Sequence, residues 1–232
     1  MMENIPTHEY KGSTKNKKRD GYGRLFISKL SSISTLQNLI KYKVYLDFEE
    51  YLESKWDKNG NLIVKKNNYF LITYTGCFKN NLPHGLGTLT FNGGTYRGQF
   101  KNGKFDGYGK LITKFYSYDF DRHSYVGYFK NNYPNGKGKF ILKNFRYCRG
   151  QEGNFINGQL NGKGKITWSN SEYKGMVKNG LQHGKGKLIF LNTGDIHIGY
   201  WKKGEFIKGR IYEAKIKKWK IIKWKKLIKK IN

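Results

Sequence analysis

Two histidines, His84 and His183, each stand directly before a glycine, and imidazoles in such positions can ligate metals or transfer protons. Four further copies of the same short pattern hold aspartate or asparagine here, namely Asp20, Asp106, Asn135 and Asn161. His, Asp and Asn are the non-glycine residues that best tolerate a left-handed backbone, and their side chains cap turns. We therefore interpret all six as turn residues, not as metal ligands or catalytic groups.

Other groups that could do chemistry lack the spacing that their chemistry needs. The segments NGKGK and GKGKL have the glycines and lysines of phosphate loops, but no GxxxxGK[ST] pattern is present. Cys77 and Cys148 follow neither a zinc nor a disulfide spacing, which favours a reducing intracellular setting. The 16 acidic residues form no pair at a motif spacing. The sequence therefore predicts no catalytic residue, no cofactor and no metal.

The composition is basic and rich in glycine and aromatic residues. Among 232 residues, 29 are glycine and 16% are aromatic, which is typical of a β protein. The net charge of +29 predicts acidic partners, although a lysine bias of the whole proteome would give the same composition. Outward aromatics are sporadic, so we expect nucleic acid to bind only nonspecifically. The start does not resemble a signal peptide and no apolar stretch reaches about 20 residues, so we expect a cytoplasmic protein, peripheral to cytoskeleton or membrane.

One pattern recurs along the chain, and the segment YRGQFKNGKFDGYGKLI (96–112) shows it most completely. With Tyr96 as position 0, glycine stands at position 2, an aromatic at 4, Asn-Gly at 6 and 7, glycine at 11 and 13, and an aliphatic residue at 15. Copies begin at Tyr74, Tyr96, Tyr125, Gln151, Tyr173 and His197, and a weaker copy covers residues 10–25. A recurrence of this kind is the signature of a repeat protein.

Each copy predicts a β-hairpin. Positions 0, 2 and 4 alternate onto one face of a first strand, positions 11, 13 and 15 onto one face of a second, and Asn-Gly is a strong hairpin-turn signal. A two-residue turn at Asn102-Gly103 would place Gly98 opposite Gly107, and Tyr96 opposite Gly109. The glycines then form a floor over which the aromatic rings lie.

The pattern assigns two sets of residues to the inner face. The structural glycines are Gly76, Gly85, Gly87, Gly98, Gly107, Gly109, Gly127, Gly136, Gly138, Gly153, Gly162, Gly164, Gly175, Gly184 and Gly186. The aromatic trough consists of Tyr74, Phe78, Tyr96, Phe100, Tyr125, Phe129, Tyr173 and Trp201. The trough either binds a partner strand or helix, or only fills the curvature of its own sheet, and self-association into a homodimer would also cover it.

The spacing resembles the MORN repeat family, whose pattern is close to Tyr-x-Gly-x-aromatic-x-Asn-Gly-x-x-x-Gly-x-Gly-x-aliphatic. The resemblance implies an all-β fold, an elongated twisted antiparallel sheet of consecutive hairpins. It also implies a scaffold, as in radial spokes, at the cell cortex or at membrane junctions. Some family members carry an enzymatic domain, but this chain leaves no room for one beside the repeats. We therefore expect a protein that is not an enzyme.

We expect four segments along the chain. Residues 1–27 are a degenerate N-terminal repeat, and residues 28–73 are an insertion followed by a degenerate β unit that continues the sheet. Residues 74–212 hold six repeats. Residues 213–232 are predicted to form a basic amphipathic C-terminal helix, because apolar residues of KIKKWKIIKWKKLIKKIN share one side of a helical wheel and most lysines lie opposite.

Two basic surfaces are candidates for binding. On the outer face of the repeats, lysines recur at position 5 and at positions 12 and 14: Lys79, Lys101, Lys130, Lys178, Lys202, Lys137, Lys139, Lys163, Lys165, Lys185 and Lys187. In the tail, the candidate membrane- or partner-binding residues are Lys217, Lys218, Trp219, Lys220, Trp224, Lys225, Lys226, Leu227 and Ile228. The tail lies in a lipid interface, binds a calmodulin-type partner, or caps the open edge of the sheet.

We expect a non-catalytic scaffold that binds proteins, cytoskeletal or membrane-associated, through its repeats. Its tail is expected to attach it to a membrane or another polyanion. Two alternatives stay open. One is a module that binds anionic phospholipid through the basic face of the repeats, and the other is a structural subunit of an axonemal, radial-spoke-like assembly.

Overall fold

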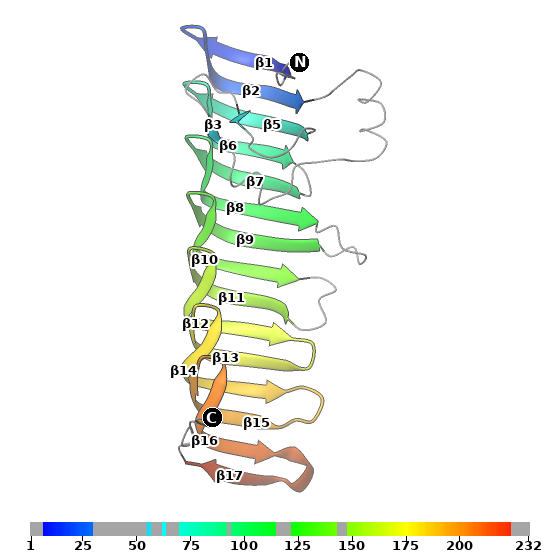
Figure 1. Ribbon diagram of the computed structural model, residues 1–232, viewed down its shortest axis with the longest axis vertical. Coiled ribbons are helices and arrows are strands. Elements are labelled where there is room, and N and C mark those ends of the chain that lie inside the picture. Colours follow the sequence, from blue (N-terminus) through cyan, green and yellow to red (C-terminus); the bar gives the residue numbers. More distant parts are fainter. Residues whose placement is uncertain are drawn as a thin grey trace, which may run out of the picture. The chain divides into compact units, whose positions relative to one another are not determined.

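The computed structural model describes residues 7–29, 55–56, 62–63, 70–91, 94–114, 122–142 and 148–223. The chain forms two compact units, Met1–Tyr133 and Pro134–Asn232. Apart from one 3-10 turn, all regular elements of the described residues are β-strands, and consecutive strands pair antiparallel within each unit. The predicted all-β fold of consecutive hairpins is confirmed (Figure 1).

In the first unit, the strands of the main sheet follow one another in chain order. They are β1 (Thr7–Lys15), β2 (Lys18–Lys29), β5 (Phe70–Lys79), β6 (Leu82–Phe91), β7 (Gly94–Lys101), β8 (Lys104–Lys114) and β9 (Arg122–Lys130). The weak copy at residues 10–25 is thus a hairpin, formed by β1 and β2.

The prediction that a degenerate β unit within residues 28–73 continues the sheet is wrong. Strand β2 pairs directly with β5, whereas β3 (Lys55–Trp56) and β4 (Leu62–Ile63) pair only with each other in a separate two-stranded sheet. Gly23 of β2 pairs with Gly76 of the next repeat. The repeat pattern, and not proximity in the sequence, therefore determines which strand lies beside β2. Residues 30–54, 57–61 and 64–69 of the predicted insertion lie outside the described residues.

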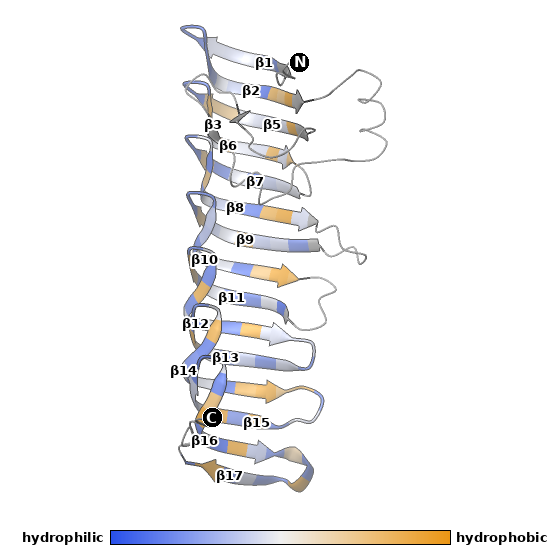
Figure 2. Cartoon of the chain, in the orientation of Figure 1, coloured by the Kyte–Doolittle hydropathy of each residue, from blue (hydrophilic) through white to orange (hydrophobic). Residues whose placement is uncertain are grey.

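In the second unit, the sheet again follows chain order. Its strands are β10 (Tyr133–Leu142), β11 (Cys148–Ile156), β12 (Gln159–Trp168), β13 (Ser171–Lys178), β14 (Leu181–Phe190), β15 (Ile196–Lys202), β16 (Glu205–Glu213) and β17 (Lys218–Ile222), with the 3-10 turn η1 (Ala214–Ile216) before the last strand. Hydrophobic residues gather toward the C-terminal ends of β10, β12 and β14, and the hairpin tips carry both hydrophilic and hydrophobic residues (Figure 2).

The hairpin turns lie where the sequence predicts them. Asn102 and Gly103 both have positive φ, 51° and 76°, which is the geometry of a type I′ turn. Other hairpins place asparagine in the same conformation, as at Asn131 and Asn132 with φ of 51° and 75°. The turn twists with the strands, so a two-residue connection suffices in each repeat.

The predicted cross-strand pairing, in contrast, is wrong by two residues. Gly98 lies opposite Gly109 and Tyr96 opposite Leu111, because the register shifts between Gly98 and Phe100. The bulge uses Gly107, whose φ of +102° suits glycine, and the Gln99 side-chain oxygen accepts a hydrogen bond of 2.9 Å from the Tyr108 amide. Counting from the turn assumed a regular ladder, which the glycine at position 11 interrupts.

This shifted register aligns the glycines of neighbouring strands into one row in each unit. The row of the first unit runs Gly12, Gly23, Gly76, Gly87, Gly98, Gly109, Gly127. The row of the second unit runs Gly138, Gly153, Gly164, Gly175, Gly186, Gly199, Gly209. Without side chains, these positions let the sheet be covered closely from its inner side.

A tyrosine ring lies directly on the glycine row in most repeats, as predicted. A Cβ atom built on Gly109 would stand 2.4 Å from the Tyr96 hydroxyl, and one on Gly98 would stand 2.5 Å from the Gly109 Cα. The Tyr96 hydroxyl donates a 2.9 Å hydrogen bond to the Gln99 carbonyl, three residues along. Four other tyrosines donate in the same way to the residue three positions on: Tyr10, Tyr74, Tyr125 and Tyr173.

Two repeats lack the tyrosine, and they differ in what lies over their glycines. In the repeat that begins at Gln151, the fully buried Leu160 covers the row, with methyl groups 2.9 Å from a Cβ built on Gly153 and 3.0 Å from one built on Gly164. In the last repeat, only backbone atoms are nearest to a Cβ built on Gly199 or Gly209. Its Trp201, at position 4, is 5% exposed and packs edge-on against Tyr173 of the preceding repeat.

The tips of successive hairpins are joined by one recurring backbone hydrogen bond. The amide at position 7 of a repeat donates to the carbonyl at position 9 of the repeat before it. The bonds run from Asn81 to Arg19, Gly103 to Pro83, Asn132 to Phe105, Gly158 to Pro134, Gly180 to Leu160 and Gly204 to Gln182, at 2.8–3.0 Å. These bonds bind each curled tip to its neighbour, because the bulge has turned the tip away from the regular ladder.

The predicted C-terminal helix is wrong for the described part of the tail. Residues 214–216 form a single 3-10 turn, Lys217 has a left-handed φ of 51°, and the chain returns as β17 along the edge of β16. Trp219 lies opposite Tyr212, with ring centroids 5.2 Å apart. A strand satisfies the exposed amides and carbonyls of β16, which a helix would leave unpaired. Residues 224–232 lie outside the described part.

We expect Gly109→Ala to lower the free energy of unfolding by about 1–3 kcal/mol, because the new methyl group collides with the Tyr96 ring. Gly164→Ala is the matched control, since it lies in a glycine row covered by the flexible end of Leu160. Denaturant unfolding of both variants compares the two costs. Equal losses would contradict a specific role for the tyrosine.

Alkaline pH should destabilise the fold through its buried tyrosines. Burial raises the pKa of Tyr125 and that of Tyr173 to about 12, and the ordinary value of the unfolded chain is about 10. The folded state thus favours the neutral phenols, so their contribution is intact below about pH 10 and is lost as the pH rises from about 10 to about 12. Unfolding midpoints measured along this range should fall less steeply in Tyr125→Phe/Tyr173→Phe, and identical slopes would refute this cause.

Candidate functional site

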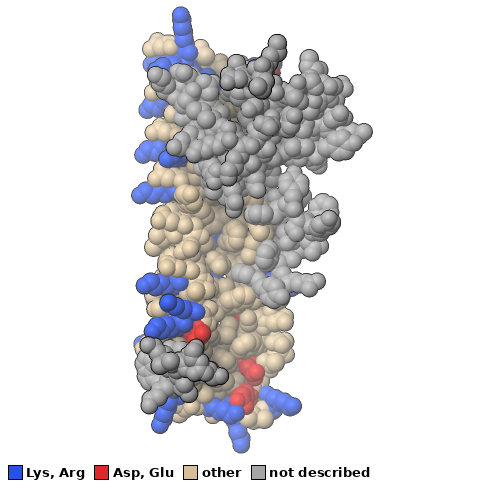
Figure 3. Space-filling model, in the orientation of Figure 1, with Lys and Arg blue, Asp and Glu red and all other residues tan. Residues whose placement is uncertain are grey.

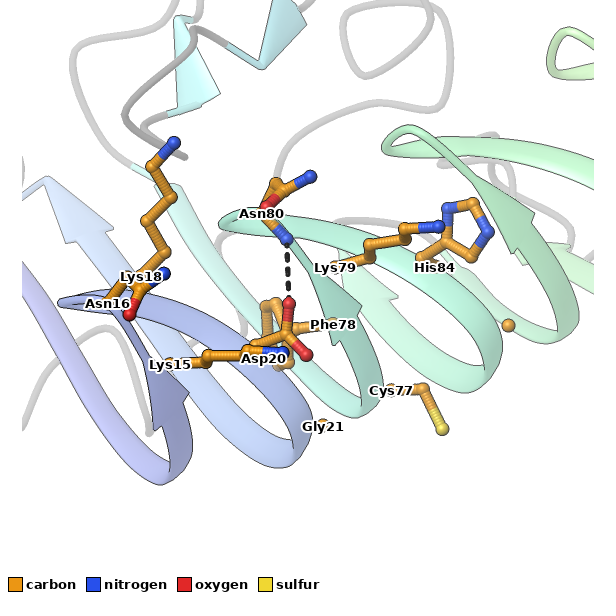
Figure 4. A pocket seen from close by; sticks show the side chains of 11 residues that line it. Lys15, Asn16, Lys18, Asp20, Gly21, Cys77, Phe78, Lys79, Asn80 and His84 are labelled. Atoms are coloured by element: carbon orange, nitrogen blue, oxygen red, sulfur yellow. Dashed lines mark hydrogen bonds between the residues drawn. The ribbon is translucent and has the colours of Figure 1, made fainter.

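The residues with potential for catalysis lie at the hairpin tips. One pocket of about 590 Å³ lies between the tips of β1–β2 and β5–β6, and Asp20, Cys77 and His84 are among its lining residues (Figure 4). The Asp20 carboxylate accepts a hydrogen bond of 3.5 Å from the Asn80 amide in the next turn. The His84 Nδ1 atom is buried without a hydrogen-bond partner, and the Cys77 thiol points away from that ring. These groups do not form a nucleophile–base pair.

The interpretation of position 10 as turn chemistry is correct in one part and wrong in another. Its side chains do cap turns: the Asp106 carboxylate accepts from the Asn131 amide at 3.4 Å, and Asn161 accepts from the Asn179 amide at 3.0 Å. The left-handed backbone, however, belongs to the glycine at position 11. Gly85 and Gly184 have φ of 75° and 71°, whereas neither histidine before them has a positive φ.

The tip asparagines also act between repeats, which the sequence pattern did not reveal. The Asn132 side-chain oxygen accepts a hydrogen bond of 2.7 Å from the Phe105 amide, and that of Asn81 accepts one of 2.8 Å from the Arg19 amide. A second Asn in place of the glycine of Asn-Gly is the only sequence signal for this contact. These contacts hold the tips at Asn81 and Asn132 against the preceding repeat, and they occupy the backbone amides of Arg19 and Phe105.

The aromatic trough is filled by its own side chains. The exposed fractions of Tyr74, Phe78, Tyr96, Phe100, Tyr125, Phe129, Tyr173 and Trp201 are between 0% and 5%. Neighbouring rings contact edge to face, as Tyr96 does with Phe100 and Phe129 at about 5.1 Å, and Tyr96 stacks on Phe105 at 3.7 Å. These rings form the core, as in the alternative in which they fill the curvature of the sheet. Partner binding by this set stays a prediction.

The lysines at position 5 stand at the tips and are exposed. Lys79, Lys101, Lys178 and Lys202 each end the first strand of a hairpin, directly before its turn. In the first unit, the cationic side chains project along the edge where the tips lie (Figure 3). Most tips therefore add one positive charge, and the exception is the hairpin of β11 and β12, which has Ile156 at this position.

Lysines at positions 12 and 14 lie on the outer face of the second unit, and all but the half-buried Lys165 are exposed. Some of them form ion pairs: Lys165 and Lys174 lie 2.6 and 2.9 Å from Glu172, and Lys139 lies 3.5 Å from Glu152. The hydrogen bonds from Lys165 and Lys174 lower the pKa of Glu172, which stays ionised. The predicted basic surface is present here, partly neutralised by two glutamates.

The tail residues that the structure describes are exposed but tied to β16. Lys217, Lys218 and Lys220 are exposed and Trp219 is 49% exposed. Lys220 pairs with Glu213 at 2.5 Å, and the Arg210 guanidinium lies 5.4 Å from the Trp219 ring. Trp224, Lys225, Lys226, Leu227 and Ile228 lie outside the described residues. The alternative that the tail caps the sheet edge agrees with β17, although it does so as a strand.

The described residues include neither a cluster of metal-ligating side chains nor a membrane-spanning helix. Within them, no group of three His, Cys, Asp or Glu side chains could hold a metal ion. They also contain no helix with the length and apolar character that a membrane crossing needs.

Comparison with known proteins agrees with this architecture. The MORN repeat matches the chain five times, at residues 74–95, 96–113, 125–144, 152–172 and 173–192. No curated protein matches the sequence. MORN repeats are generally repeats of scaffold proteins that bind membranes or proteins, and the family is typically non-catalytic. With its hairpins, glycine rows and five matched repeats in residues 74–192, the chain belongs to the MORN-repeat proteins.

Proposed function

We propose that this protein is a non-catalytic scaffold whose repeats bind other proteins at the cytoskeleton or cell cortex. Its basic C-terminal segment attaches it to a membrane or another polyanion. In this proposal the sheet is a rigid support, and recognition takes place on its outer face and at its hairpin tips.

The observation that supports this proposal is that the inner face of the sheet is buried and the outer face is exposed. The inner aromatics are buried, and the position-10 side chains of Asp20 and Asn161 accept hydrogen bonds from turn amides, so these groups are occupied within the protein. The outer face instead exposes lysines together with large apolar side chains such as Leu86 and Tyr108, which are 66% and 52% exposed. Exposed apolar and charged side chains on a rigid sheet suit the binding of a macromolecule.

One observation favours a second candidate function, a phospholipid-binding module that uses the basic face of the repeats. Lysines 163, 165, 185 and 187 are gathered on the outer face of β12 and β14 in the second unit. Anionic headgroups would be attracted to such a surface, at about 1 kcal/mol for each cation near the membrane. The two candidates differ in the segment that carries the affinity for lipid.

Vesicle binding separates the two. Replacing Lys217, Lys218, Lys225 and Lys226 by Gln keeps β17 paired and spares Lys220, which pairs with Glu213. We expect this variant to co-sediment at least about tenfold more weakly with anionic vesicles at physiological salt, and neutral vesicles to bind neither form. Replacing Lys79, Lys101, Lys178 and Lys202 by Gln removes the same charge from the hairpin tips and is the control.

Each contrary result has a definite meaning. The tail variant could retain vesicle binding while a variant with Gln at Lys163, Lys165, Lys185 and Lys187 loses it. This result would replace the scaffold proposal by the phospholipid module. Absence of binding in all forms would remove the membrane attachment. Protein binding is tested separately by cross-linked affinity capture from the native cell, where the full chain should retain the same partners after the tail charges are neutralised.

A further inference from the structure

One outward row of the second unit carries a lysine on every second strand, and all its members except the half-buried Lys208 are exposed. From β10 to β16 the row consists of Lys137, Asn154, Lys163, Met176, Lys185, Tyr200 and Lys208. Its neighbours are direct cross-strand partners, except at the bulges that follow Asn154 and Met176. Each row member stands next in sequence to a residue of the inner glycine row, as Lys163 does to Gly164 and Lys185 to Gly186. We call this set the lysine row.

The lysine row is specific to its position and is not a product of composition alone. The first unit has the same outer row, and there it consists of Tyr22, Cys77, Leu86, Gln99, Tyr108 and Tyr128. That row holds no charged side chain, although 45 of the chain's residues are Lys or Arg. A general lysine bias would have filled both rows alike.

The lysine row also differs from the row beside it, which contains Lys139, Glu152, Lys165 and Lys174. In that neighbouring row, Glu152 pairs with Lys139, and Glu172 reaches across to pair with Lys165 and Lys174. The lysine row contains no acidic residue. Its apolar members lie between the charges: Tyr200 has the Lys185 ammonium 5.7 Å and the Lys208 ammonium 5.0 Å from its ring, and Met176 is 39% exposed.

The spacing of the row matches one kind of polypeptide. Strands lie about 4.8 Å apart, so lysines on every second strand recur at about 9.6 Å. Seven residues of α-helix advance about 10.5 Å, and residues three or four positions along fall halfway on the same face. A polyproline helix repeats at about 9.3 Å, but its halfway point falls between residues, so nothing would face Met176 or Tyr200. An extended strand repeats its facing side chains at about 6.8 Å and matches neither interval.

We propose that the lysine row docks an acidic amphipathic helix of a partner protein. Carboxylates seven residues apart would pair with Lys163, Lys185 and Lys208, and apolar residues between them would cover Met176 and Tyr200. The distance from β12 to β16 corresponds to about 13 residues of helix. Over this length, flexible lysine side chains can compensate for the small difference between the lysine spacing of about 9.6 Å and the helical advance of about 10.5 Å. This inference rests on the proposed function, because it names the kind of protein that the scaffold binds.

The test uses two fluorescent peptides of the same composition, each about 21 residues long and stabilised as a helix. The periodic peptide carries Glu every seven residues with Leu halfway between, and the scrambled peptide places the same residues without that period. Fluorescence anisotropy with the full-length protein at physiological salt should show about fivefold to tenfold tighter binding of the periodic peptide.

Two pairs of lysine variants locate the site. Lys163→Gln/Lys185→Gln removes two charges of the row, and Lys178→Gln/Lys202→Gln removes two from nearby hairpin tips. All four side chains are exposed, so both proteins should unfold at the wild-type midpoint. We expect the first pair alone to weaken the periodic peptide about fivefold or more. The reversed pair Lys163→Glu/Lys185→Glu should instead prefer a periodic peptide in which Lys replaces Glu.

Three results would overturn the proposal. The first is equal affinity for periodic and scrambled peptides, and the second is equal loss in the two glutamine variants. The third is binding of anionic vesicles or of a single-stranded oligonucleotide that depends on Lys163 and Lys185 more strongly than peptide binding does. The first two results would leave the scaffold function standing, since affinity capture with the full chain tests that function independently.

Discussion

The structure depends on the contact between a tyrosine ring and a bare glycine backbone. A methyl group at Gly109 would stand 2.4 Å from the Tyr96 hydroxyl, so the ring lies where any other residue would place its side chain. This contact lets one sheet supply both layers of its own core: the strands form the floor and the rings form the cover. A single sheet normally leaves an apolar face exposed, and here the face is closed within each repeat.

The bulge at position 11 makes this closure possible. At Gly107 it shifts the register by two residues, which brings Gly98 opposite Gly109 and aligns the glycines into a row. It also turns the hairpin tip, and the tip is then held by a backbone hydrogen bond to the previous repeat, such as that from Gly103 to Pro83. Residues with catalytic potential, including Asp20 and Asp106, serve the same tips, which explains their recurrence without invoking catalysis.

With the inner face closed, the outer face carries the differences on which binding can depend. The same row holds no charged side chain in the first unit and carries lysines in the second, although the glycine row beneath continues in both. Structural positions are held by packing, so they tolerate little change. Outward positions are free of that constraint, and their chemistry identifies the partner.

The sequence by itself determined the hairpins, the Asn-Gly turns and the glycines that lie under the tyrosine rings. It misplaced the glycines at position 11, because Gly85 and Gly184 face the outward side chains of Cys77 and Met176. These follow from local rules, namely the two-residue period of a strand and the positive φ that asparagine and glycine accept. Only the tertiary structure decided the register, the replacement of a missing tyrosine by Leu160, and the path of residues 214–222 along β16. Each of these three features depends on hydrogen bonds and contacts between neighbouring strands. A helical wheel drawn for the tail contains none of that information, so it could not show that the edge of β16 favours a strand.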